Sequence, residues 1–176
     1  MMVHLQREIT LRTPGRGMTE ITRDVAGVVA EAGIVTGLCV VFCRHTSAGL
    51  LIQENADPGV QTDLLHWLER VAPDGDPRYV HDDEGPDDMA AHLRTLLTGV
   101  QVTVPICEGR LGLGTWQGIY LAEHRVRPHT RRMVVHVSGE KWTKMEIRRL
   151  KSEKRSAMSL FGEQVPIRFC FFLNGV

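Results

Sequence analysis

Four of the eight histidines stand where an imidazole side chain has chemistry within reach. They are His45, His81, His92 and His124. A neutral imidazole is a common metal ligand, and its pKa near neutrality also suits proton transfer. Three imidazoles can hold Zn²⁺ and leave its fourth position open. The histidines are far apart in the chain and no HExxH sequence is present. They therefore indicate a metal or acid–base site only if the fold brings them together.

His81 begins the sequence HDDEG, and His92 lies in the segment that follows it. The spacing of Met89, His92, Leu93 and Leu96 places His92 on the apolar face of an expected helix. A histidine on such a face is often a hydrogen-bonded core residue, and the alternative is a ligand or catalytic role shared with His81. The three acids after His81 either form a solvated surface or hold a hard cation and orient the imidazole.

His45 follows an apolar segment and precedes Thr46, Ser47 and an Ala-Gly pair. Small residues let a backbone come close to a ligand. A turn whose hydroxyl groups satisfy backbone atoms explains the same residues equally well. Both interpretations stay open.

His124 ends the expected strand GIYLAEH, directly after Glu123. Side chains alternate along a strand, so these two residues should face opposite sides unless the strand ends or bulges between them. Glu123 would then lie among apolar neighbours. A carboxylate so placed needs a partner, and we expect a general base with a raised pKa.

In the turn EGRLGLGTWQG, three glycines fall within the first seven residues, at Gly109, Gly112 and Gly114. Backbone amides in such turns can cradle an anion, and Arg110 adds positive charge. Trp116 is suited to stack on an aromatic ligand and Gln117 to hydrogen-bond it. The alternative is a hairpin turn with a core tryptophan. The turn lacks GK[ST], and no helix is expected after it, so it is neither a Walker loop nor a dinucleotide fingerprint.

These segments depend on an expected order of strands and helices. Alternating and apolar runs predict strands at residues 3–12, 35–44, 47–54, 100–106, 118–124 and 131–139. Helical spacing predicts helices at about 20–32, 58–71 and 87–98, with a long loop over 72–86. Strands and helices do not alternate regularly. The fold class should therefore be α+β with mostly antiparallel strands.

Length and composition suit one soluble domain. The chain has 176 residues, of which 43% are hydrophobic and 24% charged. No apolar run is long enough for a transmembrane helix, and the N-terminus lacks the apolar core of a signal peptide. The four cysteines show no CxxC spacing, so reduced thiols in a cytoplasmic protein are expected.

The zero net charge is a sum over two unlike segments. Residues 1–140 hold 13 Arg, no Lys and 18 acids, whereas residues 141–176 hold four Lys and four Arg against three acids. We therefore expect a domain at 1–140 and a basic C-terminal extension at 141–176. The extension is either a genuine addition or a frameshifted or read-through C-terminus. An acidic domain argues against nucleic acid as a partner.

Four stretches resemble the YjbQ-type family, long catalogued as uncharacterised protein family 0047. They are CRHTSAGLLIQENADPGVQTDL, YVHDDEGPDDMAAHLRTLLTG, VPICEGRLGLGTWQGIYLAEHR and RRMVVHVSGE. The resemblance runs in one register from about residue 3 to Glu140. It implies a small α+β fold with a β-sandwich-like core and flanking helices, a cytoplasmic location and a homotrimer.

The family resemblance also implies an activity. The family is associated with a secondary, low-efficiency thiamine-phosphate synthase reaction, which joins an aminopyrimidine diphosphate to a thiazole phosphate and releases diphosphate. Departure of diphosphate needs a divalent cation or arginines. The alternatives are a metal-dependent hydrolase and a non-enzymatic trimer that binds a small anionic metabolite.

The resemblance and the residues together define the expected site. We expect a divalent metal, Mg²⁺ or Zn²⁺, and a small phosphorylated molecule as the partner. The expected metal ligands are His81, His92, His124 and Glu84. The expected catalytic residues are His45, His92, Gln117 and Glu123. The expected substrate-binding residues are Thr46, Ser47, Arg110, Thr115 and Trp116.

Overall fold

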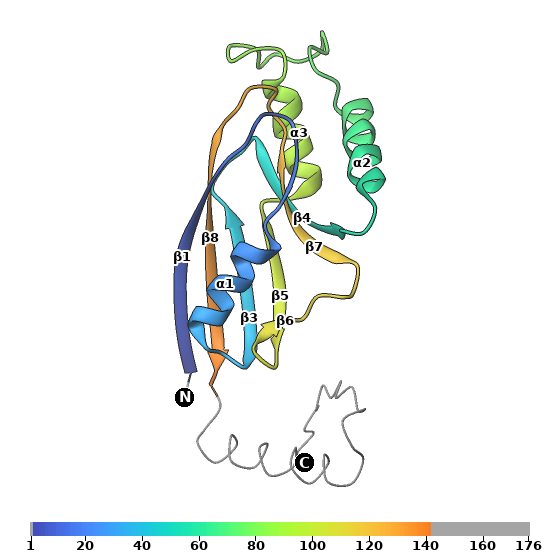
Figure 1. Cartoon of the computed structure of the whole chain (residues 1–176). Helices are drawn as coiled ribbons and strands as arrows, with labels where there is room; N and C mark the ends of the chain where they lie inside the picture. Colours follow the sequence, from blue (N-terminus) through green and yellow to red (C-terminus); the bar gives the residue numbers. More distant parts are fainter. Residues whose placement is uncertain (1, 142–176) are drawn as a thin grey trace, which may run out of the picture.

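The computed structural model describes residues 2–141 and contains two antiparallel sheets with three helices (Figure 1). The expected α+β class is confirmed. Of the expected extension at 141–176, residues 142–176 lie outside the described residues. The elements are, in chain order, β1 (Met2–Arg12), β2 (Gly17–Glu20), α1 (Thr22–Ala32), β3 (Thr36–Cys43), β4 (Ala48–Glu54), α2 (Pro58–Val71), α3 (Asp88–Thr98), β5 (Gln101–Cys107), β6 (Arg110–Leu111), β7 (Gln117–Glu123) and β8 (Thr130–Glu140).

The larger sheet has the strand order β1-β8-β3-β5-β6, and the smaller has β2-β7-β4. The long strands β1 and β8 pair along their whole length, from Met2 opposite Glu140 to Arg12 opposite Thr130. Side chains alternate in β8 between buried and more exposed positions, as a strand covered on one face requires. Helix α1 lies across this larger sheet (Figure 1).

The core lies between α1 and the inner faces of both sheets. Helix α1 buries Val25, Val28, Val29 and Ala32, which recur at helical spacing. Full burial stabilises each valine by roughly 1.5–3 kcal/mol. The helix ends at Gly33, whose left-handed φ of 61° lets its N–H bond the carbonyls of Val29 and Ala30.

Helices α2 and α3 lie together at one end of the molecule, and the long loop joins them (Figure 1). Asp57 caps α2 by accepting a hydrogen bond of 2.7 Å from the Gly59 backbone N–H, and Pro58 takes the first helical position. Helix α3 packs against β4. None of the helices in the described part of the chain is long and apolar enough to cross a membrane.

Two short strands, β2 and β6, were not expected from the sequence, because strands of four and two residues carry too little periodicity to detect. Strand β7 ends at Glu123, so His124 is the first residue beyond it. Both side chains are buried, because β7 is covered on both of its faces from Gly118 to Glu123, so opposite-facing neighbours are both shielded from solvent.

Candidate metal centre

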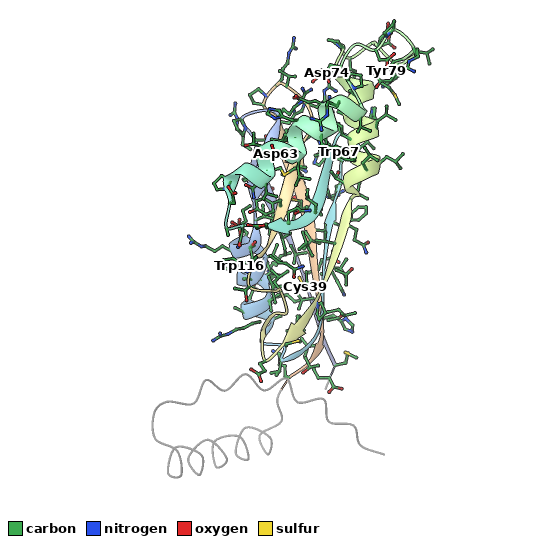
Figure 2. The ribbon with its side chains drawn as sticks, turned by 90° about the vertical axis from the view of Figure 1, so that its right-hand side faces the viewer. Cys39, Asp63, Trp67, Asp74, Tyr79 and Trp116 are labelled. Atoms are coloured by element: carbon green, nitrogen blue, oxygen red, sulfur yellow. The ribbon has the colours of Figure 1, made fainter. Side chains whose placement is uncertain are left out.

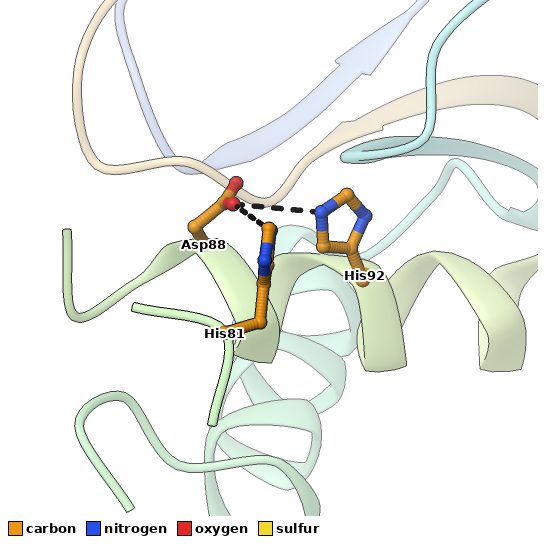
Figure 3. Close-up of side chains that lie close together, drawn as sticks. All are labelled: His81, Asp88 and His92. Carbon is orange, nitrogen blue, oxygen red and sulfur yellow. Dashed lines mark ion pairs between the residues drawn. The ribbon is translucent and has the colours of Figure 1, made fainter. Parts of the chain in front are cut away.

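Three side chains converge on one point at the start of α3. The ligand atoms of His81, Asp88 and His92 all lie within 4.8 Å of one another (Figure 3). Asp88 Oδ2 is 2.8 Å from His81 Nε2 and 3.5 Å from His92 Nε2. The expectation that the fold brings His81 and His92 together is therefore fulfilled by this geometry.

The elements that carry these residues explain the convergence. Asp88 is the first residue of α3 and His92 follows one turn later, so both project from the same face of the helix. His81 comes from the preceding loop. That loop is closed at its base by a hydrogen bond of 2.8 Å from the Gly75 N–H to the Pro86 carbonyl.

The hydrogen bonds around His92 fix its tautomer. His92 Nδ1 lies 2.9 Å from the backbone carbonyl of Thr46, which can only accept, so Nδ1 carries the proton. In the neutral ring, the lone pair of Nε2 then faces Asp88 Oδ2. Metal-binding histidines are typically oriented in this way, by donating their other ring N–H to a carbonyl or carboxylate.

Asp88 Oδ2 is a buried carboxylate oxygen without a hydrogen bond from any residue in the described part of the chain. The 2.8 Å approach of His81 Nε2 lacks hydrogen-bond geometry. A buried anionic oxygen that faces two ring nitrogens needs a cation or a proton between them, because unpaired buried charge is costly. Two imidazoles and one carboxylate are a donor set that fits a divalent transition metal.

Arg125 holds the other side of Asp88. Its Nη1 pairs with Asp88 Oδ1, its Nε lies 3.1 Å from Asp87 Oδ2, and its Nη2 donates a 2.8 Å hydrogen bond to the Glu84 carbonyl. This leaves Oδ2 as the free oxygen of Asp88. Arg125 is itself buried, so it acts as a fixed counter-charge between the loop and α3.

Glu84 and His124, both expected as ligands, are not placed with the cluster. The Glu84 carboxylate points toward Arg125, with Oε2 3.4 Å from Nη1. His124 Nε2 lies 3.2 Å from Thr98 Oγ1. Burial, reinforced by the nearby positive charge of Arg94, lowers the pKa of His124 to about 3.

The expectation of a raised pKa at Glu123 is wrong. Burial alone would raise it, but Arg131 forms two bonds of 2.6 Å to its carboxylate, and the Arg125 N–H and Thr13 hydroxyl donate two more. These donors stabilise the charged form more than burial disfavours it, so the pKa of Glu123 is lowered. A carboxylate held in this way is a poor general base.

The segment His45–Ser47 borders the cluster through its backbone. Thr46 contributes the carbonyl that binds His92, and Ser47 accepts a 3.1 Å hydrogen bond at Oγ from Arg131 Nη2. His45 Nε2 accepts a 2.8 Å hydrogen bond from the Arg132 N–H. Burial and the nearby positive charge of Arg131 lower the pKa of His45.

The glycine-rich segment lies elsewhere. Strand β6, which carries Arg110, is at the end of the sheet away from α3 (Figure 1). Gln117 Oε1 accepts a 2.8 Å hydrogen bond from the Gly114 N–H, and Thr115 is exposed. Trp116 is 64% exposed, so the alternative of a core tryptophan is wrong (Figure 2). Within one chain, this group does not join the cluster.

The expected metal ligands and catalytic residues did not include Asp88 or Arg125. Asp88 had a detectable signal, since it precedes His92 by four residues in an expected helix and so shares its face. Arg125 had none, because only the turn after β7 brings it to α3.

The comparisons agree with this architecture. A family model described as "UPF0047 protein YjbQ-like" matches residues 7–140. The chain belongs to this family. UPF0047 protein sll1880 of Synechocystis is 51% identical over 135 residues, which cover 77% of this chain and 92% of that protein. YjbQ of Escherichia coli O157:H7 is 38% identical over 136 residues, covering 77% and 98%.

Solved structures of related proteins have the same fold. A YbjQ-like protein of unknown function from Sulfolobus solfataricus aligns with a TM-score of 0.73 at 28% identity, over 80% of this chain and 100% of that one. An uncharacterised YjbQ/UPF0047 protein from Clostridium acetobutylicum aligns with a TM-score of 0.68 at 41% identity, over 73% and 97%. Membership of the YjbQ family thus fixes the fold and leaves the activity open.

Proposed function

We propose that this YjbQ-family chain is a divalent-metal-dependent enzyme that acts on a small phosphorylated molecule, and that hydrolysis is the reaction its site supports best. One observation carries the proposal. Asp88 Oδ2 is buried without a hydrogen bond from the described residues and lies within 3.5 Å of two imidazole nitrogens. Zn²⁺ is the metal that this nitrogen-rich set favours.

The chain's own residues would prepare the site for such an ion. The Thr46 carbonyl orients His92, and Arg125 holds Asp88 so that one oxygen stays available. A divalent ion held there supplies a Lewis acid that polarises a phosphoryl oxygen and acidifies water. Three protein ligands leave room in a tetrahedral shell for water or substrate.

Space and positive charge for a substrate lie beside the cluster. A cavity of about 410 Å³ opens in the loop, and His81 and Tyr79 are among its lining residues. Arg44, the residue after β3, and Arg132, near the start of β8, are exposed and contact only Glu8 among the ion pairs of the described residues. Their guanidinium groups are suited to bind phosphate.

Thiamine-phosphate synthase activity is the second candidate, and the exposed Trp116 favours it. A tryptophan that is 64% exposed beside Gln117 offers a stacking surface and hydrogen bonds to an aminopyrimidine. Since this group is remote from His81 and His92 in one chain, the reaction would need the expected homotrimer to bring the two groups together across a subunit boundary.

The test combines metal analysis with two assays on the purified full chain. The wild-type protein should bind about one Zn²⁺ per chain and hydrolyse a generic phosphate ester such as p-nitrophenyl phosphate. His92→Ala should lose both properties, whereas His66→Ala, an exposed histidine on α2, should keep them.

Thiamine-phosphate formation is measured in parallel with Trp116→Ala and Gln117→Ala. Synthase activity that needs Trp116, without ester hydrolysis, would favour the second candidate. Metal-free protein with neither activity would contradict both enzymes and favour a trimer that only binds a metabolite.

A further inference from the structure

A single buried carboxylate connects the two residue groups that orient the metal ligands. Glu123 is 1% exposed and lies at the end of β7, in the smaller sheet. Its strongest partner, Arg131, belongs to β8 in the larger sheet. We propose that Glu123 is a positioning residue for the metal centre, through which Asp88 and His92 are held in one common geometry. This inference rests on the metal site of the proposed function.

The first connection runs from Glu123 to Asp88. Glu123 Oε1 accepts a 3.0 Å hydrogen bond from the backbone N–H of Arg125. This bond fixes the start of the turn after β7. From that turn, the Arg125 guanidinium binds Asp88 Oδ1 and the Glu84 carbonyl, and so ties α3 to the loop that carries His81.

The second connection runs from Glu123 to His92. Arg131 binds both carboxylate oxygens of Glu123, Nε to Oε2 and Nη2 to Oε1, each at 2.6 Å. The same Nη2 also lies 3.1 Å from Ser47 Oγ and 3.3 Å from the Ser47 carbonyl. The preceding carbonyl, that of Thr46, accepts the hydrogen bond from His92 Nδ1 at 2.9 Å.

The chemistry of the position requires a carboxylate. Glu123 receives donors from Arg131, Arg125 and Thr13, and all of them approach acceptor oxygens. An amide in its place would turn one acceptor into an NH₂ donor that faces these groups. Buried polar groups whose partners are mismatched force neighbouring segments to shift. The shift would reach both Asp88 and His92, because both connections begin at this carboxylate.

The decisive comparison is Glu123→Gln against Thr13→Val in the full chain. Thr13 donates a 2.9 Å hydrogen bond to the same carboxylate but belongs to neither connection. Zinc affinity is measured by competition with a chromogenic chelator. Ligand geometry is measured by the visible absorption of Co²⁺-loaded protein, and thermal unfolding is recorded for each variant.

Glu123→Gln should weaken zinc binding by up to about 10-fold, the lower end of the effect of losing a partner bonded directly to a ligand, because it acts through Arg125 and Arg131. It should also change the Co²⁺ spectrum. Thr13→Val should leave zinc affinity and the spectrum close to wild type, even if it unfolds at a lower temperature. Wild-type zinc affinity and spectrum in a folded Glu123→Gln variant would overturn the inference while leaving the metal centre intact.

Two further outcomes are decisive. If Glu123→Gln does not fold, Arg131→Lys takes its place, because it keeps the positive charge beside Glu123 and loses the contacts to Ser47. An altered Co²⁺ spectrum in that variant supports the inference, and an unaltered one overturns it. If the wild-type chain binds neither Zn²⁺ nor Co²⁺, the proposed function fails and the inference fails with it.

Discussion

Asp88 and His92 lie one turn apart on α3, and the 3.5 Å between Asp88 Oδ2 and His92 Nε2 contains no hydrogen bond. Nδ1 of the ring is committed to the Thr46 carbonyl, so the facing atoms are both acceptors when the ring is neutral. This arrangement, with two facing acceptor atoms, is the one that the proposed metal site requires.

Asp88→Ala should reduce zinc affinity by at least 10-fold, because it removes the anionic ligand. It should also lower the free energy of unfolding by about 1–3 kcal/mol, since Arg125 loses one buried partner and keeps Asp87 and the Glu84 carbonyl. Chelator competition and chemical denaturation measure the two effects. Asp83→Ala is the matched control, because this exposed carboxylate precedes the same helix. An equal loss of zinc affinity in both variants would remove Asp88 from the ligand set.

Stability should fall below pH 6.5 because of His124. The pKa of His124 is about 3 in the folded chain against an ordinary value of 6.5, so below pH 6.5 the unfolded state binds a proton that the folded state does not. The free energy of unfolding should therefore decrease as pH falls through the window from 6.5 toward 3. This residue contributes a loss of about 1 kcal/mol between pH 7 and pH 5.5.

Denaturant unfolding at the two pH values measures the slope. His124→Asn should be less stable at both pH values but show a shallower pH dependence, whereas His66→Asn should keep the wild-type slope. An identical slope in all three proteins would mean that His124 titrates normally in the folded chain.

Gly49→Ala should destabilise the fold by about 1–3 kcal/mol, a typical cost of overpacking. A Cβ at this position would lie 1.9 Å from Thr98 Oγ1 and 2.7 Å from the Gly99 carbonyl oxygen, so β4 and the end of α3 would have to separate. Gly27→Ala in α1 is the opposite case, because nothing lies within 4 Å. It should stabilise the chain by about 0.5–1 kcal/mol. Thermal unfolding of the two variants should shift in opposite directions.

Asp57→Ala should cost about 1 kcal/mol through loss of the cap on α2. Asp63→Ala, an exposed change within the same helix, should have an effect within about 0.5 kcal/mol. Because the Asp57 side chain holds a backbone N–H of the first turn of α2, hydrogen exchange in that turn should increase in Asp57→Ala and not in Asp63→Ala. Equal exchange in both variants would show that the cap contributes little.

Helix α1 and the long strands were predictable because each carries a periodic apolar pattern. The four valine and alanine positions of α1 and the alternation in β8 are examples. The apolar face predicted for α3 was wrong, since Leu96 is 79% exposed and the buried face carries Ala91 and Arg94 instead.

The convergence of His81 and His92 was also predictable, since His81 lies only a few residues before the helix that carries His92. By contrast, the surroundings of Glu123 depend on Arg131 across two sheets, and no local pattern reports that contact. The raised pKa expected there was wrong because the partner was invisible in the sequence.

The loop that carries His81 has a further consequence. Of the three proposed ligands, His81 alone comes from outside α3, so a bound ion would cross-link the loop to the helix. A ligand that binds only the folded loop lowers the population of its open form by mass action. Arg78 in this loop has a side chain that is 84% exposed, and trypsin cleaves after arginine. If zinc slows trypsin cleavage after Arg78, gel electrophoresis of the digest would detect zinc binding without any substrate.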